Sequence, residues 1–280
     1  MIEFEMLGEK IQFRYPNLGL LYYKFAPKNT SGNFSSQFVA RFTQPDLKPN
    51  EQIIKKRMQV YSDAGYACVE MRTVSRFICG IGYSSSIEWG FGFDWTSGMP
   101  CLPGSSVKGA LLSYLEFLQE SSFEEKGNSP NQSNSSDVEL LTNGEKWSKE
   151  QVFTLFGSQG NDSIKESGAA SFLDAYPIYY KGLEVEVITP HYKNYYGKKS
   201  GSKLPDDTEN PVPIHFLTVK PGSVFAFYFC LRPQIISQKT EKDYWKKRIK
   251  ELIVETGQNY GFGAKTASGY GYFEPVEEKS

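Results

Sequence analysis

The order of helical and extended patterns constrains the fold of this 280-residue chain more than any other feature. Apolar residues recur at three- and four-residue steps in residues 51–62, 107–118 and 241–257, which predicts three amphipathic helices, and residues 148–157 predict a short capped one. Extended patterns occupy residues 68–82, 168–180, 183–192, 214–219 and 223–231. Helices interleaved with largely antiparallel strands predict an α+β sandwich.

The last two extended patterns flank the turn Lys220-Pro-Gly-Ser223. Proline and glycine stand there at the positions that a tight turn favours. We therefore predict a β-hairpin formed by residues 214–219 and 223–231.

Two polar stretches interrupt these patterns. The helix that begins near residue 105 fades near Glu120, and residues from about 120 to 146 are rich in Ser, Asn and acidic side chains, which is typical of a disordered insertion. Residues 193–213 are rich in Gly, Pro and charge and predict a second long loop. Because neither stretch divides the chain cleanly, we predict one domain over residues 1–280, with an N-terminal extension over about 1–65.

Composition excludes some classes of protein. A net charge of -1 and a pI near 6.2 exclude a generally basic nucleic-acid binder, so RNA binding would depend on local patches. The four cysteines are scattered without a C-x-x-C pair, which argues against a zinc site and a disulfide framework. We expect a cytoplasmic protein without metal or cofactor. The first ten residues lack a basic segment followed by an apolar run, and no stretch approaches 18 consecutive apolar residues, so we expect neither secretion nor membrane insertion.

The stretch "PGSSVKG", residues 103–109, combines turn residues with a helix start. Ser105 or Ser106 is suited to cap the helix. Gly109 costs about 1 kcal/mol of helix stability relative to alanine, and Lys108 stands where the helix dipole prefers an anion. Both features suit a bound phosphate, because glycine lets a backbone approach and lysine adds a positive charge. The alternative is a core helix whose glycine accommodates a crossing strand.

Near the C-terminus, four glycines alternate with aromatic residues in residues 260–272. The sequence Gly263-Ala264-Lys265-Thr266 nearly matches a nucleotide-binding phosphate loop, but Ala264 breaks the spacing, and a strand pattern follows where that motif needs a helix. This excludes a nucleotide-hydrolysing loop. A glycine-kinked edge strand is the plain structural alternative.

Taken together, the "PGSSVKG" helix start and the glycine-rich loop at 261–271 resemble the RAMP superfamily of CRISPR-associated proteins. Four segments between them are similar to the sixth-subunit family of type III-B (Cmr) effector complexes: "LFGS" at 155–158, "ASFLDAYP" at 170–177, "TPHYKNYY" at 189–196 and residues 211–219. The matched segments run from about residue 72 to 273. The first 70 residues and the stretch at 120–146 carry no such resemblance.

This resemblance implies a ferredoxin-like (RRM-like) RAMP fold with glycine-rich loops and long insertions. It also implies a non-catalytic, RNA-binding subunit in antiviral defence. Its expected partners are crRNA, single-stranded target RNA and other Cmr subunits, namely a repeating backbone subunit, a terminal RAMP subunit and a small helical subunit. Because guide sequences vary, such a subunit must hold RNA by its backbone and base faces without reading base edges.

The candidate RNA-binding residues come from three stretches. The helix start offers Ser105, Ser106, Lys108 and Gly109, and the glycine-rich loop offers Gly261, Gly263, Lys265, Thr266 and Ser268. The basic and aromatic stretch after residue 190 offers His191, Tyr192, Tyr195, Tyr196, Lys198 and Lys199, unless it is simply a solvated loop. Arg72 and Arg76 are weaker candidates, because they can pair with acidic neighbours instead.

Two other classes of function stay open. A metal-dependent endoribonuclease that cleaves target or guide RNA would use Asp94, Asp174 or His191, although none has a partner set visible in the sequence. The resemblance adds that target-cleaving RAMP subunits are expected to carry an aspartate in the loop that holds Asp94. Asp174 also suits a strand end, where it would accept hydrogen bonds from backbone N–H groups. A protein-only scaffold would make the lysines of the two glycine-rich motifs dispensable.

Overall fold

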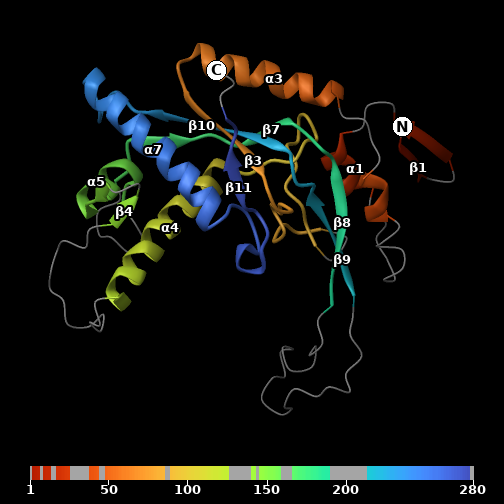
Figure 1. Ribbon diagram of the computed structural model, residues 1–280. Helices are drawn as coiled ribbons and strands as arrows, with labels where there is room; N and C mark the ends of the chain where they lie inside the picture. Colours follow the sequence, from red (N-terminus) through yellow and green to blue (C-terminus); the bar gives the residue numbers. More distant parts are fainter. Residues whose placement is uncertain are drawn as a thin grey trace.

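The computed structural model describes residues 2–6, 9–13, 17–25, 38–43, 48–85, 89–125, 140–142, 145–158, 166–189 and 213–277. Figure 1 shows a central sheet flanked by helices, with a two-stranded ribbon reaching away from it. None of the described helices combines the length and the apolar character needed to cross a lipid bilayer.

The central sheet is antiparallel and has β3 (Ala67–Thr73) and β10 (Val224–Leu231) at its centre. Strand β11 (Phe273–Pro275) pairs with the outer side of β3. The other side of β10 pairs with β6 (Ala170–Phe172) and then with β7 (Tyr176–Tyr179), so these two short strands form one interrupted edge.

Helices α4 (Gly104–Glu125) and α7 (Lys239–Asn259) complete a repeated split β-α-β arrangement. Along the chain the order is β3, α4, β6 with β7, β10, α7, β11, whereas across the sheet it is β11, β3, β10, then β6 with β7. This is the strand order of the ferredoxin-like fold. The two helices lie side by side (Figure 1), and the predicted α+β class and ferredoxin-like fold are confirmed.

Both faces of the sheet are covered, which explains why β10 is apolar along its whole length. On one face, Phe227 packs against Phe262 and Phe273, with ring centroids 4.9 and 5.7 Å apart. On the other face, the Tyr228 hydroxyl lies 3.1 Å from that of Ser62 on α3 (Lys48–Asp63). The helix predicted over 51–62 is therefore present, and it covers the face of the sheet opposite Phe227.

The predicted β-hairpin is wrong. Strand β9 (Ile214–Val219) pairs with β8 (Leu183–Ile188), and Figure 1 shows this ribbon extending away from the sheet. The turn at 220–223 exists, but its Ser223 carbonyl accepts from Thr73 N–H at 2.8 Å and its Lys220 N–H donates to Gly182 O at 3.0 Å. The physical reason is that β3, β6 and β7 already occupy both edges of β10, so the turn carries the chain from the ribbon into the sheet.

The stretch expected to be a disordered insertion is regular at both ends. Helix α4 continues to Glu125, past the expected end near Glu120, and β4 (Leu140–Thr142) pairs with β5 (Glu145–Trp147). Trp147 is fully buried, and the Arg248 guanidinium of α7 lies 4.4 Å from its ring centroid. The chain is therefore anchored by an aromatic side chain directly after the predicted insertion, and residues 120–125, 140–142 and 145–146 of that stretch lie in regular elements. Residues 126–139 lie outside the described residues.

The remaining elements flank this core. The short helix predicted after Ser148 is α5 (Lys149–Phe156), which begins with a capping box between Ser148 and Gln151. The extended pattern at 68–82 is a strand only as far as Thr73. The N-terminal elements are β1 (Ile2–Met6), β2 (Glu9–Phe13), α1 (Leu18–Lys24) and the 3-10 helix η1 (Arg41–Thr43). Leu21 belongs to the same buried cluster as Phe225.

The start of α4 is fitted against the break in the edge strand. The helix begins at Gly104, whose N–H donates to the Asp174 carboxylate at 2.8 Å, so neither Ser105 nor Ser106 is the cap. A Cβ on Gly104 would lie 2.2 Å from the Phe172 carbonyl oxygen, whereas a Cβ on Gly109 would meet nothing within 4 Å. Of these two glycines, only Gly104 is required by close packing. The described residues contain no strand that crosses α4 at Gly109.

These two glycines predict opposite effects of the same substitution. Gly104→Ala forces a methyl group into a backbone carbonyl and should lower the free energy of unfolding by about 1–3 kcal/mol. Gly109→Ala gains helix propensity in open space and should raise it by about 1 kcal/mol. Urea unfolding of both variants, followed by circular dichroism, measures the two changes. Equal effects would contradict this account of the helix start.

Candidate nucleic-acid interface

A groove of about 470 Å³ separates the start of α4 from the glycine-rich loop. On the helix side, its lining includes Ser106, Gly109 and Ser113, which follow one another at helical spacing on one face. On the loop side it includes Tyr260, Gly261, Gly263, Ala264 and Thr266, and its floor and rim come from residues 79–83, Leu102 and Pro103. The fold thus brings together five of the predicted residues: Ser106, Gly109, Gly261, Gly263 and Thr266.

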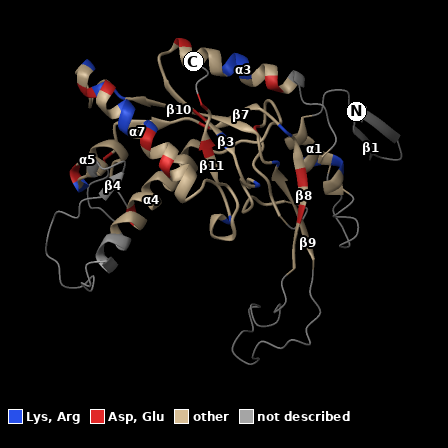
Figure 2. Cartoon of the chain, viewed as in Figure 1, with Lys and Arg blue, Asp and Glu red and all other residues tan. Residues whose placement is uncertain are grey.

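The groove is uncharged: none of its lining residues is Lys, Arg, Asp or Glu. Charged side chains of both signs instead follow the surfaces of α3 and α7 (Figure 2). The groove offers glycine backbone, the aliphatic hydroxyl groups of Ser106, Ser113 and Thr266, and the phenol side chains of Tyr83 and Tyr260. In the part of the chain that the structure describes, the N–H groups of Ile81, Gly82 and Gly263 have no hydrogen-bond acceptor.

The glycine-rich loop is held tightly against residues 76–78. Ala264 N–H donates to Ile78 O at 2.9 Å, and Gly271 N–H donates to Arg76 O at 2.8 Å. Gly263 has φ +88°, and a Cβ there would lie 2.2 Å from Ile78 O. Gly271 is equally restricted, because its Cβ would lie 2.0 Å from Phe262 O. These glycines are required by close backbone approach, which makes the loop a fixed wall.

Lys265 and Ser268 lie on this loop but outside the groove lining. Lys265 is the one non-glycine residue with positive φ (61°) among the residues that the structure describes. Its ammonium nitrogen lies 4.8 Å from the Trp89 ring centroid, a cation–π contact. Ser268 ends the 3-10 helix η2 (Thr266–Ser268), and its side chain is exposed.

The lysine at the helix start, Lys108, is also outside the groove lining. Burial, followed by the nearby charge of Arg232, lowers the pKa of the Lys108 ammonium. Ser105 is exposed beside it and is likewise not part of the lining. The lysine expected to contact phosphate at this point is therefore near another cation, on a different side of α4.

The remaining predicted cations divide into two groups. Arg72 pairs with Glu274 at 3.4 Å, and Arg76 pairs with Glu184 at 2.6 Å and Glu186 at 3.2 Å, which is the pairing with acidic neighbours that made them weaker RNA-binding candidates. The basic and aromatic stretch with His191, Tyr192, Tyr195, Tyr196, Lys198 and Lys199 lies outside the described residues.

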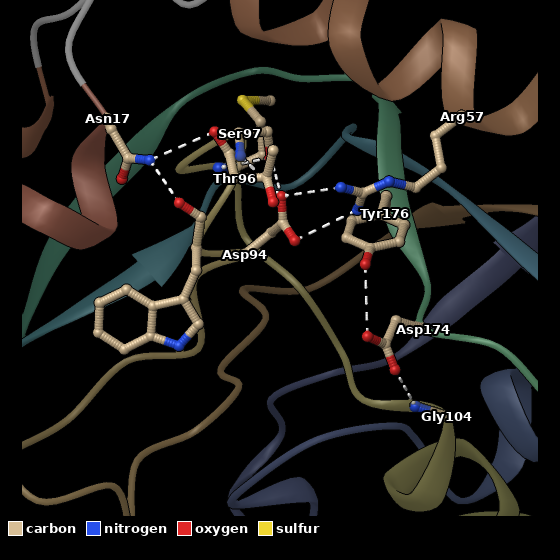
Figure 3. A network of polar contacts seen from close by, with 10 residues as sticks. Asn17, Arg57, Asp94, Thr96, Ser97, Gly104, Asp174 and Tyr176 are labelled. Atoms are coloured by element: carbon tan, nitrogen blue, oxygen red, sulfur yellow. Dashed lines mark hydrogen bonds and ion pairs between the residues drawn. The ribbon is translucent and has the colours of Figure 1, made fainter.

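Asp94 is the centre of a polar network (Figure 3). Its carboxylate accepts from Ser97 N–H at 2.7 Å and Ser97 Oγ at 2.6 Å, and it pairs with the Arg57 guanidinium at 3.2 Å. Burial raises the pKa of this carboxyl, but the bonds from Ser97 and Arg57 outweigh burial and lower the pKa overall. Asn17 fixes the same turn by donating to Trp95 O at 2.8 Å.

A second carboxylate closes the network toward the groove. Asp174 accepts from Gly104 N–H at 2.8 Å and from the Tyr176 hydroxyl at 3.3 Å, which confirms the prediction of a strand-end residue that binds backbone N–H groups. The Arg57 guanidinium lies 4.7 Å from the Tyr176 ring centroid and so joins the two carboxylates (Figure 3). Among the residues described, no three His, Cys, Asp or Glu side chains converge as metal ligands do.

Sequence reasoning missed two parts of this region. Residues 79–83, "CGIGY", line the groove, although residues 79–82 were included in a predicted strand. The two glycines at 80 and 82 were a usable signal of a turn. Arg57 was treated only as part of an amphipathic helix. No sequence spacing pairs it with Asp94, because 37 residues separate the two.

The Asp94 network predicts a pH-dependent stability difference. Asp94→Asn removes the charge that holds Arg57 and Ser97, and should lower the free energy of unfolding at pH 7 by about 2 kcal/mol. The folded-state pKa is depressed below its ordinary value of 3.8. The stabilisation is therefore fully present above that value and is lost as the pH falls through the folded-state pKa.

Urea unfolding at pH 7 and at successively lower pH tests this prediction. The difference in free energy of unfolding between the wild type and Asp94→Asn should become smaller below about pH 4. Asp243→Asn, on the exposed side of α7, is the control for a general charge effect. A difference in free energy of unfolding that does not change with pH would contradict the role assigned to Asp94.

The ferredoxin-like strand order and the two facing glycine-rich segments define a class of protein. The family model of the RAMP superfamily matches residues 71–274, and the chain belongs to this superfamily. The resemblance found in the sequence is therefore confirmed.

Particular relatives sharpen this assignment. The CRISPR system Cmr subunit Cmr6 of Pyrococcus furiosus is 29% identical over 261 aligned residues, covering 79% of this chain and 72% of the relative. Cmr6 of Saccharolobus solfataricus is 25% identical over 247 residues, covering 84% and 69%. Among solved structures, a chain of the type III-B Cmr-beta complex bound to cognate target RNA matches with a TM-score of 0.56 and 23% identity, covering 88% of this chain and 72% of that one. This last similarity concerns the fold.

Proposed function

We propose that this chain is a non-catalytic subunit of a type III-B CRISPR effector complex and holds single-stranded RNA independently of sequence. The curated relatives are both named as Cmr6 subunits of such systems, and one structural relative belongs to a complex with target RNA. The guide RNA and the repeating, terminal and small helical Cmr subunits are its proposed partners.

The observation that carries this proposal is the groove between the two glycine-rich motifs. Gly109 lowers helix stability, yet a side chain there would meet nothing within 4 Å, so packing within the chain does not require it. A backbone that must approach the helix closely does require it. The N–H groups of Ile81, Gly82 and Gly263 are donors suited to phosphate oxygens. Such contacts do not read base edges.

The absence of charge in the groove lining has a measurable consequence. Affinity that depends on lysine contacts to phosphate falls steeply with salt, because each contact releases counterions. In this groove, N–H groups and hydroxyls make the contacts instead. We therefore expect the RNA affinity of the purified chain to depend only weakly on salt concentration. Lys108→Ala and Lys265→Ala should each change the slope of log affinity against log salt concentration by less than the loss of one phosphate contact would.

The ribonuclease alternative has weaker support. Asp94 is engaged by Ser97 and Arg57, and Asp174 is engaged by Gly104 and Tyr176. Both carboxylates therefore have structural partners that account for their presence. Incubation of the purified chain with RNA and magnesium tests this point. Intact RNA supports the proposal, whereas cleavage that a chelator abolishes, and that Asp94→Asn or Asp174→Asn removes, would overturn it.

The groove itself is tested by filling it. Gly109→Leu places a side chain in the groove and should weaken binding of several unrelated single-stranded RNAs by about tenfold, a loss equivalent to about 1.4 kcal/mol. Ser105→Leu is the matched control, because it adds the same side chain on the same helix outside the groove lining. Fluorescence anisotropy with labelled RNAs gives both affinities.

The outcome separates the three classes of function. If Gly109→Leu weakens the affinity for all RNAs equally and Ser105→Leu keeps the wild-type affinity, the result supports sequence-independent binding of RNA in the groove. Wild-type affinity in both variants would contradict the role of the groove. A wild-type chain that binds no RNA but still joins the other subunits would favour the protein-only scaffold.

A further inference from the structure

A second hollow lies beside the groove and has a different character. Its volume is about 680 Å³, and its lining residues include Tyr23, Tyr83, Phe91, Phe93, Trp95 and Lys24. Phe91 and Phe93 are buried, so the aromatic side chains accessible to a ligand are those of Tyr23, Tyr83 and Trp95. We call it the aromatic pocket. Tyr83 lines both the aromatic pocket and the groove, so the two hollows share a wall.

Trp95 is the most exposed aromatic side chain of this pocket, with 63% of its surface accessible. The turn that carries it is nevertheless firmly held: Asn17 donates to Trp95 O at 2.8 Å, and Gly98 N–H donates to Asp94 O at 2.7 Å. The ion pair between Asp94 and Arg57 anchors the same turn to α3 (Figure 3). The network thus presents a large aromatic side chain to the pocket from a fixed backbone.

Tyr23 is fixed as well, but by its hydroxyl group. This hydroxyl donates to Phe91 O at 2.6 Å and accepts from Phe91 N–H at 2.9 Å. Its ring centroid lies 5.7 Å from that of Trp95 at an angle of 42° between the rings. Since the hydroxyl is already used, Tyr23 contributes a ring face to any ligand, as Trp95 does.

We propose that the aromatic pocket receives one unpaired nucleobase of the RNA whose backbone lies in the groove. This inference rests on the proposed function and adds a base-stacking site to it. A base is flat and presents a π face, which aromatic side chains bind whatever its identity. The volume lies within the usual range for ligand sites. Lys24 at the pocket supplies a positive charge for the adjoining phosphate.

The test compares Trp95→Ala with Trp95→Phe, which keeps a ring, and with Tyr244→Ala. Tyr244 is the matched control because it is an exposed aromatic residue on α7, outside both hollows. Fluorescence anisotropy with oligouridine should show about tenfold weaker binding for Trp95→Ala, a smaller loss for Trp95→Phe and no change for Tyr244→Ala. Unchanged affinity in Trp95→Ala would overturn the inference.

A second ligand distinguishes stacking from a structural effect of the substitution. An oligomer of abasic ribose phosphate of the same length has no base to stack. The wild type should bind it about tenfold more weakly than oligouridine, whereas Trp95→Ala should bind the two with similar affinity. If Trp95→Ala keeps the wild-type preference for oligouridine, the pocket does not receive a base.

The same assay separates this inference from the proposed function. If Gly109→Leu weakens RNA binding but Trp95→Ala does not, the result supports the groove as the RNA site and overturns the aromatic pocket as a base site. Absence of RNA binding by the wild type overturns both. If Trp95→Ala binds RNA normally but no longer assembles with the other subunits, the pocket is a protein-docking site and the inference is wrong.

Discussion

The close contact between the start of α4 and the interrupted edge strand determines where both walls of the groove lie. Gly104 rests against the Phe172 carbonyl, and Asp174, in the break between β6 and β7, accepts its N–H. Two further bonds between Leu102 and Ala175 complete this junction. Because the helix begins at this point, Ser106 in its first turn and Gly109 in its second turn line the groove opposite the glycine-rich loop.

The glycines of the two motifs serve different physical purposes. Gly104, Gly263 and Gly271 allow backbones to approach so closely that a Cβ would overlap a carbonyl oxygen. Gly109 and Gly82 line the groove with open space where a side chain would be. The first set builds the walls and the second leaves room between them. The sequence alone does not distinguish these two sets, because both appear in it as glycine.

The sequence patterns predicted the parts of the fold that depend on local periodicity. The helices of 51–62, 107–118 and 241–257 and the antiparallel α+β class follow from apolar spacing, and the structure contains them. Strand pairing was not predictable in the same way: the turn at 220–223 has hairpin residues, yet β10 pairs with β3 and with the β6–β7 edge. Local turn chemistry cannot show that both edges of a strand are already occupied.

In the candidate site, too, some features were visible in the sequence and others depend on tertiary contacts. The two motifs that form its walls lie far apart in the sequence, and the sequence connected them only because both matched one family. The RNA-binding role of Lys108 stays a prediction, and its side chain lies outside the groove lining, which spacing along a helix start does not show. The partnership of Asp94 with Arg57, and that of Trp147 with Arg248, depend on tertiary contacts between distant elements. Such pairs have no signature in a single sequence.

The central claim is that RNA lies between the start of α4 and the glycine-rich loop. Ultraviolet crosslinking of the purified chain to single-stranded RNA, followed by mass spectrometry of the crosslinked peptides, tests this location directly. The account predicts crosslinks in the segments 79–83 and 260–266, which contribute Tyr83 and Tyr260 to the groove. Crosslinks confined to other surfaces, such as the charged faces of α3 and α7, would contradict it.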